Sequence, residues 1–140
     1  MKKILKKIAS KIKSFEIRSY ATVAQFTEDS VLYTNGYYIV KFLSNTTGLL
    51  GVYKKEELLK EAVVPGAAKP VEGQGYPRTE EVLKVSGGSE IKMNIKYLKD
   101  MIDLMSATGE REITLTFDED KLKVFNSEAV GVLIGIRCHE

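Results

Sequence analysis

Residues 93–102 read Met-Asn-Ile-Lys-Tyr-Leu-Lys-Asp-Met-Ile, and this stretch predicts how the second half of the chain begins. Asn94 can cap a helix, because its side-chain oxygen can accept a hydrogen bond from a free backbone N–H of the first turn. Residues 90–93, just before it, favour a short strand. We therefore expect a strand that passes directly into an amphipathic helix. The apolar stripe of this helix recurs at helical spacing and consists of Ile95, Leu98, Ile102 and Met105.

Downstream of this helix, apolar and polar residues alternate, which is typical of half-buried strands. Residues 112–117 alternate cleanly, the acidic run at 118–120 predicts a turn, and residues 121–125 alternate again. Residues 129–136 are almost continuously apolar, which favours a strand at the centre of a sheet. We expect the second half to run strand, helix and three further strands.

The first half has a similar order of elements. Residues 2–14 predict an amphipathic helix with its lysines opposite its apolar side, and residues 15–26 favour a strand. A turn at 27–30 leads into a returning arm at 31–43. Within that arm, Asn35-Gly36 is either an interruption of one strand or a tight turn between two short strands, and the sequence leaves both readings open.

The middle of the chain, residues 44–89, is expected to be an irregular connection. Residues 44–51 predict a loop and residues 54–62 a short helix. Residues 63–79 hold all three prolines of the chain and have no hydrophobic period, so we expect an exposed crossing there.

The two halves can also be aligned through their hairpins. Residues 28–35 (Glu-Asp-Ser-Val-Leu-Tyr-Thr-Asn) match residues 119–126 (Glu-Asp-Lys-Leu-Lys-Val-Phe-Asn) at three of eight positions. Together with the repeated order of elements, this match indicates a duplicated unit. We therefore expect an α+β fold with two helix-plus-antiparallel-sheet halves related by internal pseudo-symmetry. The predicted single domain spans 1–140, with its halves at 1–43 and 90–140 and the connection at 44–89.

Length and composition are those of one globular domain. The chain has 140 residues, of which 44% are apolar and 29% are charged. No apolar run approaches the roughly 18 residues that a membrane-spanning helix needs. Cys138 is the only cysteine and cannot form an internal disulfide, so we expect a cytoplasmic protein.

Positive charge is concentrated at the N-terminus. Residues 1–18 hold seven basic side chains against one acidic side chain, a sum of +7 − 1 = +6, whereas the whole chain has a net charge of +2. This asymmetry is typical of a surface that meets a polyanion. The alternative is a lysine-rich helix face that is simply solvated.

Enzymatic chemistry is not expected, because the nucleophiles and bases are few. Cys138 and the single histidine, His139, lie within the last three positions, and no motif of metal-ligand spacing accompanies them. No glycine-rich loop opens a helix after a strand, so nothing indicates a phosphate cradle. We predict no catalytic residues, no metal and no cofactor.

Several segments resemble bacterial DNA polymerase sliding clamps, the β subunit of the replicase. Residues 93–102 are similar to the clamp junction Phe-Asn-x-Lys/Arg-Tyr-Leu-x-Asp-x-Leu, and residues 132–137 resemble the closing Leu-Met-Pro-x-Arg segment. Residues 32–40 (Leu-Tyr-Thr-Asn-Gly-Tyr-Tyr-Ile-Val) are similar to the clamp's Val-Ala-Thr-Asp-Gly-His/Tyr-Arg-Leu-Ala. Gly75-Tyr76-Pro77 also resembles a connector that lies between clamp domains. The resemblance covers 1–43 and 90–137 and implies one clamp-like domain.

The resemblance implies a non-enzymatic DNA-associated protein, a processivity or replication accessory factor of a phage or other mobile element. Its helices would contact the backbone of double-stranded DNA without reading sequence. The matching DNA-binding residues are Lys3, Lys6, Lys7, Lys11, Lys13, Lys96 and Lys99. The groove that receives polymerase peptides in the family would involve Ile134, Ile136 and Arg137 here.

This sequence departs from the family pattern at several points. No strand precedes the first helix, Gly135 replaces a proline, Ile134 replaces a methionine, and one domain stands where a clamp subunit has three. A closed ring would need about six copies, so a homo-oligomer is one expectation. The alternative is a monomeric clamp-derived module that binds replication proteins without encircling DNA. A third reading, attachment of the basic helix to a membrane surface, is weakened because Phe15 is its only aromatic residue.

Overall fold

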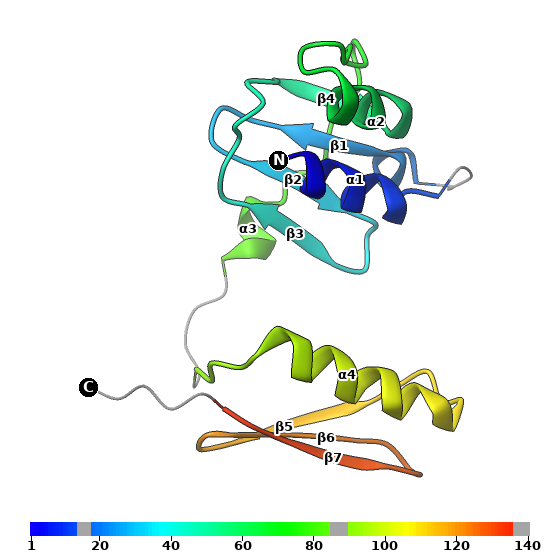
Figure 1. The fold of residues 1–140 in the computed structure, drawn as a ribbon, viewed down its shortest axis with the longest axis vertical. Helices are drawn as coiled ribbons and strands as arrows, with labels where there is room; N and C mark the ends of the chain where they lie inside the picture. The colour runs from blue at the N-terminus through cyan, green and yellow to red at the C-terminus, as the bar shows by residue number, and fades with distance from the viewer. Residues whose placement is uncertain (14–17, 85–89, 136–140) are drawn as a thin grey trace. The chain divides into compact units, whose positions relative to one another are not determined.

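The computed structural model describes residues 1–13, 18–84 and 90–135, which form mixed α and β structure with two antiparallel sheets (Figure 1). The chain divides into two compact units, unit 1 at Met1–Val85 and unit 2 at Ser86–Glu140. Each unit has a hydrophobic core of its own. The mixed α and β class is as predicted, whereas a single clamp-like domain over 1–140 stays a prediction.

Unit 1 is built on a four-stranded antiparallel sheet in the order β3-β2-β1-β4. Its helices α1 and α2 pack against each other and against the same face of this sheet (Figure 1). In chain order its elements are α1 (Lys2–Lys11), a 3₁₀ turn (Ser19–Thr22), β1 (Val23–Phe26), β2 (Val31–Thr34), β3 (Ile39–Phe42), β4 (Gly51–Lys54), α2 (Lys55–Val63) and the short α3 (Glu80–Leu83).

The core of unit 1 lies between the helices and the sheet. Phe26 is at its centre, with 2% of its surface exposed, and its ring meets that of Tyr53 edge-on at a centroid distance of 5.2 Å. The apolar side of α1 supplies Leu5, Ile8, Ala9 and Ile12, as its helical spacing predicts. Leu58 of α2 is also fully buried there. Such burial of aromatic and aliphatic side chains is the main force that holds the helices on the sheet.

The other face of this sheet is covered by the proline-rich segment after α2. Val71 donates its backbone N–H to the Val52 carbonyl of β4 at 2.7 Å. The Tyr76 hydroxyl accepts from the backbone N–H of Thr34 at 3.0 Å and donates to the Leu32 carbonyl at 3.4 Å. The Tyr76 hydroxyl therefore binds two backbone groups of β2 at the end of its ladder with β1, where Leu32 is the last paired residue and Thr34 lies beyond it.

Unit 2 is a three-stranded antiparallel sheet in the order β5-β6-β7, packed against α4. The Asn94 side chain accepts from the backbone N–H of Lys96, which confirms the predicted cap. Met105, Leu122 and Val124 form the buried cluster between helix and sheet. The elements are α4 (Ile95–Met105), a 3₁₀ turn (Ser106–Thr108), β5 (Thr114–Asp118), β6 (Lys121–Phe125) and β7 (Val130–Ile134).

One strand prediction for the first half was incomplete, and one strand of the connection was missed. The strand expected at 15–26 begins only at Val23, because Ser19–Thr22 form a 3₁₀ turn; residues 14–17 lie outside the described part of the chain. Of the two readings of the 31–43 arm, the structure has two short strands, and Asn35-Gly36 lies in the connection between them. The strand β4 was missed within the expected loop and connection, because four residues directly before a helix are too few for a period to be recognised.

Two strand predictions for the second half were wrong. Residues 90–93 form no strand in the structure. The strand at the C-terminal end, β7, is an edge strand, and the central strand is β6. A continuous apolar run normally indicates burial on both faces, but alternate residues of β7 are exposed in this unit, namely Val130, Val132 and Ile134.

Candidate functional site

The most basic feature of the described residues is the outer side of α1. This helix contains five lysines and no acidic residue, and all five side chains are exposed. Within the described residues, no acidic group lies within ion-pair distance of these lysines. We call this surface the lysine face; it consists of Lys2, Lys3, Lys6, Lys7 and Lys11.

The lysine face is unfavourable for the helix that carries it. Like charges four residues apart repel by roughly 0.2–0.5 kcal/mol per pair, and Lys2–Lys6, Lys3–Lys7 and Lys7–Lys11 are such pairs. Lysines in the first turn also oppose the positive end of the helix dipole, where acidic residues would be favourable. Only Lys11, in the last turn, is placed well for helix stability. Helix stability therefore does not account for this arrangement of charge, and neutralisation by a bound polyanion would relieve it.

The basic surface continues beyond the end of α1. A cavity of about 420 Å³ lies there, and its lining holds three lysines and one acidic residue: Lys13, Lys54, Lys55 and Glu56, with Ile12 and Thr22. The Lys55 ammonium donates to the Ile12 carbonyl at 3.4 Å, which ties the start of α2 to the end of α1. Beside the lysine face, a second groove of about 510 Å³ is lined by Phe42 and the stems of Lys3, Lys6 and Lys7.

The other predicted DNA-binding residues lie in unit 2. Lys96 and Lys99 are exposed on α4, as expected for contacts with a ligand. Asp100 and Asp103 are exposed on the same helix, so its polar side has no net excess of positive charge. The structure thus gathers Lys3, Lys6, Lys7 and Lys11 on one helix face with Lys13 just beyond, while Lys96 and Lys99 belong to a separate unit. A DNA-binding role for each of them stays a prediction.

Of the predicted partner groove, only Ile134 is described. It is exposed at the end of β7, whereas Ile136 and Arg137 lie outside the described residues. Cys138 and His139 lie outside them as well. The described residues contain no group of three or more His, Cys, Asp or Glu side chains placed to hold a metal ion. The described part of the chain also has no helix with the length and apolar character required to cross a membrane.

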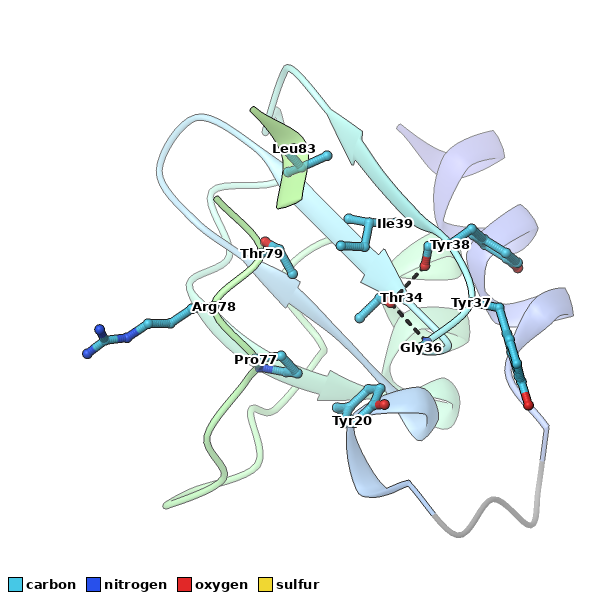
Figure 2. A pocket seen from close by; sticks show the side chains of 10 residues that line it. All are labelled: Tyr20, Thr34, Gly36, Tyr37, Tyr38, Ile39, Pro77, Arg78, Thr79 and Leu83. Atoms are coloured by element: carbon cyan, nitrogen blue, oxygen red, sulfur yellow. Dashed lines mark hydrogen bonds between the residues drawn. The ribbon is translucent and has the colours of Figure 1, made fainter. Parts of the chain in front are cut away.

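A groove that the sequence did not reveal lies in unit 1, between the β2–β3 connection and the returning segment 77–83 (Figure 2). We call it the tyrosine groove; it has a volume of about 520 Å³. Tyr37 and Tyr38 stand on one side of it, and Pro77, Thr79 and Leu83 form the other side. Tyr20, Thr34, Gly36, Ile39 and Arg78 complete its lining.

Hydrogen bonds hold the β2–β3 side of the tyrosine groove in place. The Thr34 hydroxyl donates to the Tyr38 carbonyl at 2.7 Å and accepts from the Gly36 N–H at 3.0 Å, as Figure 2 shows. Arg18 donates to the Asn35 carbonyl at 3.1 Å, and its guanidinium lies over the Tyr37 ring at 4.9 Å. These contacts fix the connection that presents both tyrosines.

Gly36 is required at the bend of this connection. Its φ of +93° is a conformation that residues with a side chain rarely adopt. A Cβ at this position would also lie 2.7 Å from Arg18 Nη1 and 2.8 Å from the Tyr20 hydroxyl oxygen. The Asn35-Gly36 pair was the signal in the sequence, but it indicated a turn and not a groove, because residues 77–83 are far away in the chain.

Comparison with known proteins adds no assignment. No model of a known protein family matches this chain, and a search of the curated proteins found no match. Proposals about its function therefore rest on the residues and on the structure described above.

Proposed function

We propose that this chain is a DNA-associated protein that contacts the backbone of duplex DNA, without regard to sequence, through the lysine face of α1. The observation that carries the proposal is that five exposed lysines share one helix side with no acidic residue among them. Each phosphate that a lysine neutralises releases condensed counterions, which favours binding to any duplex sequence. The buried side of α1 packs in the core of unit 1, so its lysines are presented on a rigid support.

A clamp-like architecture with internal pseudo-symmetry is part of this proposal. In both units a helix is followed by three consecutive antiparallel strands that are neighbours in the sheet: α1 with β1-β2-β3, and α4 with β5-β6-β7. Aligning residues 28–35 with 119–126 matches β2 with β6. The alignment pairs Val31 with Leu122 and Tyr33 with Val124, and all four of these side chains are buried in the core between helix and sheet.

The turns that follow β2 and β6 also support the repeat. In each unit a four-residue connection leads to the next strand, closed by the pairs Thr34–Ile39 and Phe125–Val130. The Asn35 side-chain oxygen accepts from the backbone N–H groups two and three residues further on, at 2.9 and 3.2 Å. Asn126, at the aligned position, accepts in the same way at 3.0 and 2.8 Å. The same residue thus fixes the same turn at the same place.

The DNA proposal is tested by reversing two charges at the centre of the lysine face. We expect Lys6→Glu with Lys7→Glu to weaken binding to a short duplex by ~100-fold at low salt. We also expect the slope of log Kd against the logarithm of the salt concentration to fall by about two. Fluorescence anisotropy with labelled duplexes of two unrelated sequences, between low and physiological salt, measures both quantities. Both side chains are exposed, so the thermal unfolding curve is expected to stay close to that of the wild type.

A matched control reverses two exposed lysines elsewhere in unit 1, Lys41→Glu with Lys84→Glu. This variant has the same net charge as the test variant and should keep most of the affinity. Equal losses in the two variants would mean that net charge alone attracts DNA, and unchanged affinity in the test variant would overturn the proposal.

The second candidate function is a module that binds a protein segment without encircling DNA. The observation that favours it is the tyrosine groove, whose mainly apolar lining suits apolar side chains of an extended peptide. The exposed aromatic rings of Tyr37 and Tyr38 are of the kind that anchors such contacts.

For this second candidate, we expect peptides selected from a random display library to lose about tenfold or more in affinity when Tyr37 is replaced by serine, because an aromatic anchor is removed. The control is Leu43→Ser, since Leu43 and Tyr37 are both 83% exposed and Leu43 does not line the groove. Titration calorimetry on the purified variants gives the comparison. Selected peptides that bind both variants equally would locate the binding surface elsewhere.

A further inference from the structure

Among the described residues, the sheet of unit 2 has two edge strands, β5 and β7, and the edge at β5 leaves core-facing side chains uncovered. Among the described residues 90–135, β5 pairs only with β6. Its register places Leu115 opposite Val124 and Phe117 opposite Leu122, so both side chains are on the face of the sheet that α4 covers. Even so, Leu115 is 50% exposed and Phe117 is 56% exposed. The core of unit 2 is therefore open along β5.

In unit 1 the strand that corresponds to β5 is β1, and a neighbouring strand covers its outer edge. Phe26 pairs with Val31 as Phe117 pairs with Leu122, so Phe26 of β1 corresponds to Phe117 of β5. Phe26 is almost fully buried because β4 pairs antiparallel with β1 and brings Tyr53 onto its ring. Directly after β4 the chain enters α2, which packs beside α1. A strand followed at once by a helix thus closes the core of unit 1.

The chain contains a second segment of this form, residues 90–105. When the N-cap residues Lys54 and Asn94 are aligned, Leu58 matches Leu98 and Ala62 matches Ile102, and each of these side chains packs against the core of its own unit. In the same alignment Met93 matches Tyr53 and Ile91 matches Gly51. Residues 90–93 take part in no β-ladder of the described structure, so their backbone groups are available for pairing.

We infer that a second copy of this chain covers β5, with its residues 90–93 added antiparallel to the free edge of that strand. The inference rests on the repeat that is part of the proposed function. The register of β4 on β1 then places Met93 of one copy opposite Leu115 of the other, and Ile91 opposite Phe117. The exchange is reciprocal, because each copy has both an unpaired β5 edge and a 90–93 segment outside any β-ladder, and it gives a two-fold symmetric dimer. Met93, which packs against the core of its own unit in the single copy, would exchange that contact for one with the other copy.

Residues 90–93 of the same copy do not lie beside the open edge of β5. Ile91 and Lys92 lie against Gly135, just past the end of β7, where a Cβ would meet the Ile91 side chain at 2.7 Å and the Lys92 carbonyl at 3.1 Å. The strand β6 separates β7 from β5 in the sheet. The dimer also brings the two α4 helices together, as α1 and α2 are in unit 1, and α4 has exposed apolar side chains for this contact at Tyr97 and Leu104.

Cysteine cross-linking between two different chains tests the register directly. Cys138 is replaced by serine in both chains; one chain then carries Met93→Cys and the other carries Leu115→Cys. The mixture is oxidised at low protein concentration and without denaturant. Opposed residues of an antiparallel pair have Cβ atoms near enough for a disulfide after a small shift. We expect the 93–115 disulfide, identified by mass spectrometry, to exceed by about tenfold the yield from Lys92→Cys mixed with Leu115→Cys, because neighbouring side chains point to opposite faces.

Light scattering gives the second measurement. Wild-type chains are expected to show a concentration-dependent dimer, and Leu115→Glu to remain monomeric with an unchanged circular dichroism spectrum. A monomer at every concentration, or equal yields from the two cysteine mixtures, would overturn the inference. These measurements contain no DNA, so they are independent of the Lys6 and Lys7 test. A monomeric protein that still binds DNA through the lysine face would reject only the inference. A dimeric protein whose DNA binding is unchanged by the Lys6 and Lys7 substitutions would reject only the DNA proposal.

Discussion

Replacing Phe26 with alanine is expected to lower the free energy of unfolding of unit 1 by about 3–5 kcal/mol. The Phe26 side chain is 2% exposed and extends from β1 into the core between the sheet and the helices. The Tyr53 ring packs edge-on against it. The loss combines the lost burial of the ring with the cavity that remains, because surrounding side chains relax only partly. Since a domain of this size is stabilised by only about 5–15 kcal/mol, unit 1 would be close to unfolding.

The control for this prediction is Phe117→Ala, the same substitution at the corresponding position of unit 2. With 56% of its surface exposed, Phe117 is expected to contribute about 1 kcal/mol or less to the stability of the isolated copy. Hydrogen exchange followed by mass spectrometry separates the two units, because peptides from each report on their own opening. Equal destabilisation by the two substitutions in dilute protein would contradict the burial described here.

Replacing Tyr76 with phenylalanine is expected to destabilise unit 1 by about 1–3 kcal/mol, although only one oxygen atom is removed. The hydroxyl accepts from the Thr34 N–H and donates to the Leu32 carbonyl, and both groups are left without this partner in the variant. Urea unfolding measured by circular dichroism gives the difference. The control is Tyr97→Phe, because Tyr97 is exposed on α4 and its loss of a hydroxyl should change stability by less than about 0.5 kcal/mol.

The pH dependence of Tyr76 provides an independent readout. Burial raises the pKa of the Tyr76 phenol, because the charged phenolate is poorly solvated there. A raised pKa in the folded state means that the protonated phenol stabilises the fold below the ordinary tyrosine pKa of about 10, and that this contribution is lost as the pH rises above it. We expect wild-type unit 1 to lose more stability than Tyr76→Phe between about pH 9 and 11. Parallel curves for the two proteins would contradict the buried position of this hydroxyl.

The clamp-like proposal and the second candidate function assign different roles to the two surfaces of unit 1. The lysine face carries unneutralised positive charge that suits a polyanion, while the tyrosine groove is lined mainly by apolar groups. Because α1 and the β2–β3 connection are separate elements, substitutions at Lys6 and Lys7 and at Tyr37 can be interpreted independently. A protein that uses both surfaces would combine DNA contact with partner binding.

The sequence by itself determined the features that depend on neighbours along the chain. The period of α1, the Asn94 cap of α4 and the alternation within β6 all arise from residues fewer than five positions apart, and all were predicted. The exposure of the lysine face follows from the same helical period. The Asn35 and Asn126 turns are also local, because each side chain binds backbone groups two and three residues away. The sequence nevertheless left the reading of Asn35-Gly36 open, and it did not single out the turn at Asn126.

Only the tertiary structure decided which strands pair and which surfaces are covered. β4 pairs with β1 across more than twenty residues, and Tyr76 reaches Thr34 across 42, so no local period reports either contact. The apolar run of β7 predicted a central strand, yet its place at the edge depends on what lies beside it. Burial is a property of several segments brought together, whereas helix period and turn chemistry are properties of one segment. This is why α1, α4 and β6 could be predicted, whereas β4, the tyrosine groove and the open edge of β5 could not.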